Sequence, residues 1–91
     1  MSSARVENQL FRFTPPAGLD LDRVVEDIGG KRSGAYVTIS LRAPRATLLI
    51  DAQGRIIVHG CKKQSIAHLA AKEVLLRMGE KESGMIVEVG P

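Results

Sequence analysis

Apolar and polar residues alternate with a period of two over several short segments of the chain, and this alternation predicts β-strands. Prolines, glycines and other turn-forming residues separate these segments. The third and fourth segments flank Ala52-Gln53-Gly54, a short loop that contains a glycine, so they are expected to form a hairpin. The five expected strands are Val6–Thr14, Ala35–Arg42, Ala46–Asp51, Arg55–Gly60 and Met85–Val89.

Two other segments repeat their apolar residues every three or four positions, which predicts helices. The first helix follows Asp20, a residue that can cap its N-terminus, and is expected to end at Ile28 before two glycines. The second is expected to begin at a Ser65 cap and to end at Gly79. The polar segment Lys31–Gly34 is expected to be a loop. The apolar positions of the second helix are Ile66, Leu69, Ala70, Val74 and Met78.

The predicted elements follow the order β-α-β-β-β-α-β within one domain that covers residues 1–91. We therefore expect an α+β fold, in which an antiparallel sheet carries both helices on one face and leaves its other face open. The alternation assigns the following residues to that open face: Asn8, Leu10, Arg12, Tyr36, Thr38, Ser40, Thr47, Leu49, Asp51, Arg55, Ile57 and His59.

Composition narrows the class of protein. A hydrophobic share of 44% is typical of a folded domain, and a single cysteine excludes an internal disulfide bond and suits a reducing compartment. No apolar run has the length that a membrane span needs, and no signal-peptide pattern opens the chain. We expect a soluble cytoplasmic protein without a membrane partner.

Positive charge is concentrated in the middle third of the chain. Residues 31–63 contain seven lysines and arginines and one acidic residue, Asp51, whereas the flanking segments are slightly acidic. This asymmetry suits a polyanionic partner, although a solvated basic surface gives the same pattern. Arg45, Arg55 and Lys62 stand at the ends of predicted strands, where they either contact phosphates or keep the strand ends soluble.

Catalytic motifs are weak. His59, Cys61 and His68 are candidate zinc ligands, but they lack the paired spacing of a zinc motif, so packed or surface positions are the expectation. Asp51 has no neighbouring carboxylate for acid–base chemistry, and no phosphate-binding glycine loop is present. We expect neither an enzyme nor a bound cofactor.

The segment from Ala43 to Lys62 resembles the repeat of the TATA-binding protein family, whose signature reads x-P-R-x-T-x-L-I-F-x-S-G-K-x-V-x-T-G-A-K. Arg55 replaces the signature lysine. The positions in step with the signature are Pro44, Arg45, Thr47, Leu49, Ile50, Gly54, Val58 or its neighbour, Gly60 and Lys62. Shorter matches extend the resemblance over nearly the whole chain, at Val6-Glu7-Asn8, Leu19-Asp20-Leu21 and Leu69-Ala70-Ala71.

This resemblance implies a fold and a function. Proteins of the family join two repeats into a saddle whose concave sheet binds the minor groove of DNA. The single repeat is thus expected to bind nucleic acid, with duplex DNA favoured, and to form a homodimer that restores the saddle. The resemblance also points to an archaeal source and a role related to transcription. The implied interface consists of Arg12, Arg42, Arg45, Arg55 and Lys62 on the nucleic-acid backbone, Asn8 and Thr47 near base edges, and Leu10, Ile57 and His59 on the same surface.

Two departures from the family pattern weaken this expectation. Each family repeat inserts two phenylalanines between base steps, and Gly34 and Asp51 stand at those positions here. Gly34 has no side chain to insert and Asp51 carries a negative charge, so strong bending of DNA is not expected. The alternative is a protein-interaction module that keeps the fold without the DNA role.

Overall fold

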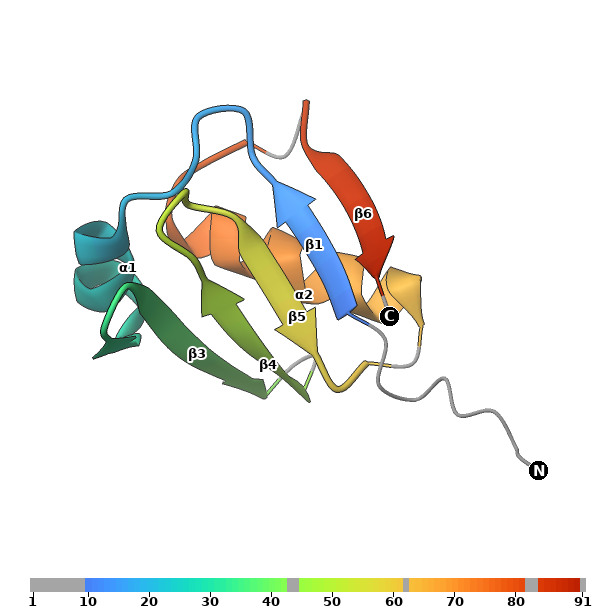
Figure 1. Cartoon of the computed structure of the whole chain (residues 1–91), viewed down its shortest axis with the longest axis horizontal. Coiled ribbons are helices and arrows are strands. Elements are labelled where there is room, and N and C mark those ends of the chain that lie inside the picture. Colours follow the sequence, from blue (N-terminus) through green and yellow to red (C-terminus); the bar gives the residue numbers. More distant parts are fainter. Residues whose placement is uncertain (1–9, 43–44, 62, 82–83, 91) are drawn as a thin grey trace.

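The computed structural model describes residues 10–42, 45–61, 63–81 and 84–90 of the chain. Six antiparallel strands form one sheet in the order β2-β3-β4-β5-β1-β6, and two helices lie on one of its faces (Figure 1). This arrangement confirms the expected α+β fold. The elements are β1 (Leu10–Thr14), α1 (Leu21–Ile28), β2 (Lys31–Ser33), β3 (Tyr36–Arg42), β4 (Arg45–Ile50), β5 (Ile56–His59), α2 (Gln64–Arg77) and β6 (Ile86–Gly90).

The core lies between the sheet and the helices. Every second residue of β3, β4 and β5 is buried there, as the alternation in the sequence predicts. Helix α2 crosses β4, β5 and β1, while α1 packs against β3. Full burial of a side chain such as Phe11 or Leu48 contributes about 1.5–3 kcal/mol to folding. The largest fully buried side chains are Phe11, Phe13, Leu48, Ile50, Ile56, Leu75, Val24, Val37, Val58 and Val74.

Helix α1 has the ends that its sequence predicts. The carboxylate of Asp20 accepts a hydrogen bond from the backbone N–H of Asp22 at 2.9 Å, which satisfies one free donor of the first turn. Gly29 adopts a left-handed conformation with φ of 82° and ends the helix.

The expected loop at Lys31–Gly34 is wrong, because Lys31–Ser33 forms the edge strand β2. Ser33 pairs with Tyr36, so only Gly34 and Ala35 separate the two strands. Gly34 has a φ of 64°, which a two-residue hairpin turn requires at its first position. All three residues of β2 are exposed, so the strand has no apolar alternation that could reveal it in the sequence.

Helix α2 differs from its prediction in its cap and in its buried face. It begins at Gln64 after Lys63, and no side chain caps it, so Ser65 is not the cap. Ile66 and Leu69, expected in the core, are 37% and 52% exposed. The residues that α2 buries are Ala67, Ala70, Ala71, Val74 and Leu75. Three of these five are alanines, whose small side chains allow the helix to approach the sheet closely.

At most ends of the other strands, the observed bound differs from the predicted one by one residue. The predicted part of the first strand from Val6 to Gln9 lies outside the described residues. Neither helix in the described part of the chain is long and apolar enough to cross a lipid bilayer.

Candidate nucleic-acid interface

The face of the sheet opposite the helices is built from the side chains that alternate with the buried ones. The strand register aligns these side chains in rows that run across the sheet. The longest row, from edge to edge, contains Lys31, Thr38, Leu49, Ile57, Arg12 and Glu88. A second row contains Ser40, Thr47 and His59, and a third contains Arg42 and Arg45.

The structure brings most of the predicted interface residues to this face. Asn8 and Lys62 lie outside the described residues. Arg55 lies in the turn that precedes β5. The residues that lie on strands of the open face are Leu10, Arg12, Arg42, Arg45, Thr47, Ile57 and His59.

Asp51 and Arg55 form a hydrogen-bonded ion pair in the turn between β4 and β5. The Asp51 carboxylate accepts hydrogen bonds from the backbone N–H groups of Gln53 at 3.0 Å and Arg55 at 2.9 Å. The same carboxylate accepts a hydrogen bond from Arg55 Nε at 2.7 Å, and the Asp51 side chain is only 16% exposed. The negative charge of Asp51 is therefore neutralised inside its own turn, and the charge of Arg55 is neutralised with it.

Arg12 and Glu88 form a second neutral pair at the β6 side of the sheet. Arg12 Nε donates to Glu88 Oε1 at 2.8 Å across the neighbouring strands β1 and β6. This hydrogen bond, together with the opposite charge, raises the pKa of Arg12 and lowers the pKa of Glu88. Glu88 was not among the residues predicted for this face, although its place between Val87 and Val89 in an alternating segment indicates the open face.

Arg42 and Arg45 have no such counter-charge. They lie directly opposite one another at the ends of β3 and β4. Within the described part of the chain, no ion pair or hydrogen bond engages either guanidinium. Like charges that face each other across two strands repel, and the repulsion costs a few tenths of a kcal/mol to about 1 kcal/mol. An anion that binds between the two side chains would relieve this repulsion.

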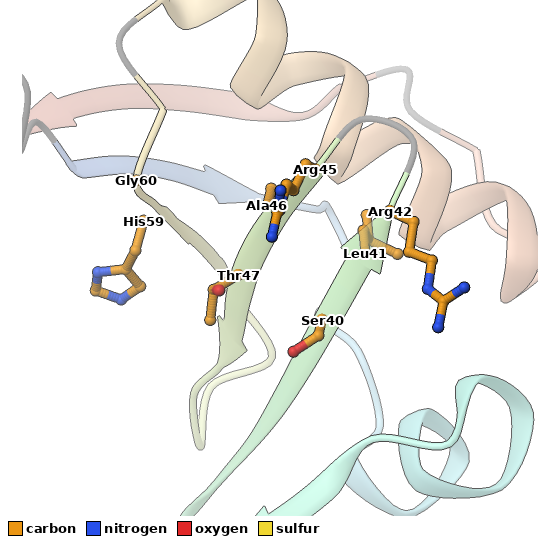
Figure 2. A pocket seen from close by; sticks show the side chains of 8 residues that line it. All are labelled: Ser40, Leu41, Arg42, Arg45, Ala46, Thr47, His59 and Gly60. Atoms are coloured by element: carbon orange, nitrogen blue, oxygen red, sulfur yellow. The ribbon is translucent and has the colours of Figure 1, made fainter.

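An open depression of about 510 Å³ surrounds these arginines at the same end of the sheet. Figure 2 shows that β3, β4 and the end of β5 contribute its residues, with Ser40, Thr47 and His59 projecting beside the arginine pair. A carboxylate is absent from its described lining, which supplies two guanidinium groups, two hydroxyl groups and one imidazole. This set of groups suits a phosphate and its flanking sugar.

The fold places the three candidate zinc ligands in different surroundings. His59 is exposed on the open face, and Cys61 is buried in the core, where burial raises the pKa of its thiol. The His68 ring packs against the Phe13 ring, with 5.5 Å between the ring centroids. Among the described residues, no group of three or more His, Cys, Asp or Glu side chains is arranged to hold a metal ion.

Aromatic side chains are nearly absent from the open face. The chain has two phenylalanines, one tyrosine and no tryptophan, all within the described residues. Phe11 and Phe13 are buried, so Tyr36, 39% exposed, is the one of these three that reaches the open face. Gly34 lies in the turn beside it and is exposed. The half-buried apolar pair Leu49 and Ile57 occupies the centre instead.

Lys31 is a cation of this face that sequence analysis did not assign to it. It pairs with Thr38, which places it at the β2 end of the longest row. Strand β2 has no apolar alternation, so the sequence pattern alone could not place Lys31 on this face.

Comparisons with known proteins agree on one family. The family model described as transcription factor TFIID (or TATA-binding protein, TBP) matches residues 3–80. Among solved structures, the chain is similar to the TBP of Methanococcus jannaschii, with a TM-score of 0.70 and 20% sequence identity. That match covers 90% of this chain and 50% of the other, so the chain spans about half the length of that protein. No curated protein sequence matches the chain.

The family model covers most of the chain, and the solved structure repeats its sheet and helices. The predicted resemblance is therefore confirmed: the chain belongs to the TATA-binding protein family.

Proposed function

We propose that this protein binds nucleic acid, with duplex DNA as the favoured form, through the open face of its sheet. The observation that carries the proposal is the pair Arg42 and Arg45, which face each other without any acidic partner among the described residues. The register places the two arginines opposite each other, and each guanidinium can donate two hydrogen bonds to phosphate oxygens. Membership of a family of DNA-binding transcription factors supports the same conclusion.

The rest of the open face is suited to contact the nucleic acid next to the arginine pair. Ser40, Thr47 and His59 form the neighbouring row, and all three are exposed. Their hydroxyl and imidazole groups are suited to sugar or base edges, whereas the arginines fix the position of the backbone. In this proposal Arg12 and Arg55 contribute less than their charge suggests, because Glu88 and Asp51 already neutralise them.

Binding is expected to leave the duplex only mildly deformed. A wedge between base steps needs an exposed apolar side chain that projects from the sheet. Leu49 and Ile57, at the centre of the face, are half buried. We therefore expect no sharp kink at the centre of the face, and affinity that depends mainly on phosphate contacts.

The decisive experiment is fluorescence anisotropy with labelled A·T-rich and G·C-rich duplexes over a salt series. The log of the binding constant should fall linearly with the log of the salt concentration, because phosphate contacts release counterions. The double variant Arg42→Ala/Arg45→Ala should weaken binding and reduce the slope by about two.

A matched control removes an arginine from the opposite layer. Arg77 lies on α2, is half exposed and pairs with Glu73 at 2.7 Å. Arg77→Ala should leave the salt slope unchanged. Absence of binding at low salt, or equal loss in both variants, would contradict the proposal.

A protein-interaction module remains the second candidate, and the exposed apolar residues of α2 favour it. Ile66, Leu69 and Leu76 lie on the outer side of the helix, with Leu76 63% exposed. If duplex binding is absent, recovery of a polypeptide by wild-type protein but not by Leu69→Lys/Leu76→Lys would support this second function.

A further inference from the structure

Positive charge is unevenly distributed over the open face of the sheet. Strands β3 and β4 lie toward one side of the sheet, next to the edge strand β2, and β1 and β6 lie at the other side (Figure 1). Strands β2, β3 and β4 contribute Lys31, Arg42 and Arg45 to the open face, and these three strands contain no acidic residue. On β1 and β6, Arg12 and Glu88 neutralise each other at 2.8 Å. A polyanion is therefore attracted to the β2–β4 side of the face.

Two observations place Lys31 on the open face. Its register partner is Thr38, which belongs to the longest row of that face. Its neighbour Arg32 lies on the helix side, because Arg32 Nη1 donates to the Asp22 carboxylate of α1 at 2.9 Å, and successive residues of a strand point to opposite faces. Lys31 is exposed, and among the residues that the structure describes no ion pair or hydrogen bond engages its ammonium group.

Strand β3 connects Lys31 to the arginine pair. Thr38, which faces Lys31, is four positions away from Arg42, which faces Arg45. At about 3.3 Å per residue this separation is about 13 Å, or about four nucleotide steps of about 3.4 Å along one strand of a duplex. The exposed Ser40 lies between them on the same face. The line along β3 thus has cations at its two ends and hydroxyl groups between them.

A line that crosses the sheet from edge to edge offers a phosphate backbone much less. The longest row leads from Lys31 over the apolar Leu49 and Ile57 to the neutral pair of Arg12 and Glu88. A phosphate above two apolar side chains loses hydration and gains no hydrogen bond. The chemistry of the described face therefore favours the line along β3.

We propose that one phosphate backbone of the bound duplex follows β3, with Lys31 at one end of the contact and the arginine pair at the other. Strands β1 and β6 stay outside the contact in this arrangement. The nucleic acid therefore lies along the strands on one side of the face instead of crossing the sheet. This inference rests on the proposed function, and it adds the direction of the bound backbone and one further phosphate ligand, Lys31.

The test is the effect of Lys31→Gln on duplex binding, measured by fluorescence anisotropy over a salt series. The variant should weaken binding about fivefold to tenfold at about 0.1 M salt and reduce the salt slope by about one, because one phosphate contact is lost. Lys31 is exposed on an edge strand, so the fold should be retained, which circular dichroism checks.

Ile86→Glu is the matched control, because it also lowers the charge of the open face by one at an exposed position. Ile86 is 61% exposed and shares the open face with Glu88, two positions further along β6. Strand β6 is four strands away from β3 in the sheet, about 19 Å at about 4.8 Å per strand. Charges are largely screened beyond about 10 Å in about 0.1 M salt, so Ile86→Glu should change affinity by less than about twofold.

An NMR titration locates the contact directly. When unlabelled duplex is added to isotope-labelled protein, the amide signals of β2, β3 and β4 should shift, whereas those of β6 should stay in place. Equal effects of Lys31→Gln and Ile86→Glu, or the largest shifts in β1 and β6, would overturn the inference.

The inference and the proposed function fail in different ways. Wild-type protein that binds no duplex at low salt would overturn both. Binding that is weakened by Arg42→Ala/Arg45→Ala but not by Lys31→Gln would leave the proposed function in place and overturn the contact along β3.

Discussion

A hairpin at each end of β4 contains an arginine, and the two hairpins differ in whether that arginine has a counter-charge. At the β4–β5 end, Arg55 bonds to Asp51, and the same carboxylate holds the turn through two backbone N–H groups. At the β3–β4 end, Arg45 faces Arg42, with no counter-charge among the described residues. The first arrangement lowers the energy of the isolated chain, and the second raises it.

This difference separates residues that hold the fold from residues that are available to a partner. A carboxylate that accepts three hydrogen bonds contributes to stability without any ligand. Two arginines without a counter-charge contribute little to stability, and they are stabilised only when an anion binds to them. The charge of an arginine on this face is therefore a poor guide to binding unless its neighbours are known.

The largest expected effect comes from Gly54→Ala in the β4–β5 turn. Gly54 has a φ of 80°, and an added Cβ would overlap the backbone N of Leu19 and lie 2.7 Å from its oxygen. Left-handed strain and overpacking together should lower the free energy of unfolding by about 3 kcal/mol or more, measured by urea denaturation. Gly60 is the control, with a φ of 79° and nothing within 4 Å, so Gly60→Ala should cost only about 1–2 kcal/mol. Equal losses would show that packing against Leu19 is unimportant.

Asp51→Ala should have the next largest effect. It leaves the N–H groups of Gln53 and Arg55 without their acceptor, so the free energy of unfolding should fall by about 2 kcal/mol in urea. Asp51→Asn should lose less, because its amide oxygen still accepts from the backbone. Asp27 makes only an exposed ion pair of 3.4 Å with Arg23, and Asp27→Ala should change stability by less than about 0.5 kcal/mol. A similar loss in both alanine variants would contradict the role assigned to the turn.

Arg42→Glu should give the β3–β4 hairpin a pair of opposite charges, like the pair at the other end of β4. A glutamate opposite Arg45 replaces repulsion with attraction, so stability should rise by about 0.5 kcal/mol in urea. Affinity for duplex DNA should fall at the same time by about tenfold or more at moderate salt. Arg77→Glu changes the net charge equally on the opposite layer and should affect anisotropy far less. Unchanged DNA affinity in Arg42→Glu would remove the arginine pair from the interface.

The smallest effect concerns the pH dependence of the Arg12–Glu88 pair. Because Arg12 lowers the pKa of Glu88 in the folded state, the pair stabilises the fold above the unfolded pKa of about 4.3. That contribution is lost as the pH falls through the folded pKa. Arg12→Gln should raise the pKa of Glu88 toward its ordinary value, as an NMR titration of the carboxyl would show. An unchanged titration would mean that the pair does not persist in solution.

Local pattern was sufficient to predict most of the fold. Alternation of apolar residues located β3, β4 and β5, and the Asp20 cap and Gly29 located the ends of α1. The signature from Ala43 to Lys62 identified the family that the comparisons confirm. These features depend on residues a few positions apart, so the sequence alone contains them.

The tertiary structure decided what depends on distant residues. The edge strand β2 has no apolar face, so only its pairing with β3 reveals it. Helix α2 buries alanines and exposes Leu69, because close approach to the sheet favours small side chains over the most apolar ones. Arg12 is neutralised by Glu88, 76 residues away in the chain. Electrostatic interactions follow distance in space, and the register of the strands sets that distance; therefore the sequence determined where the cations lie, while the fold decided which of them remain available.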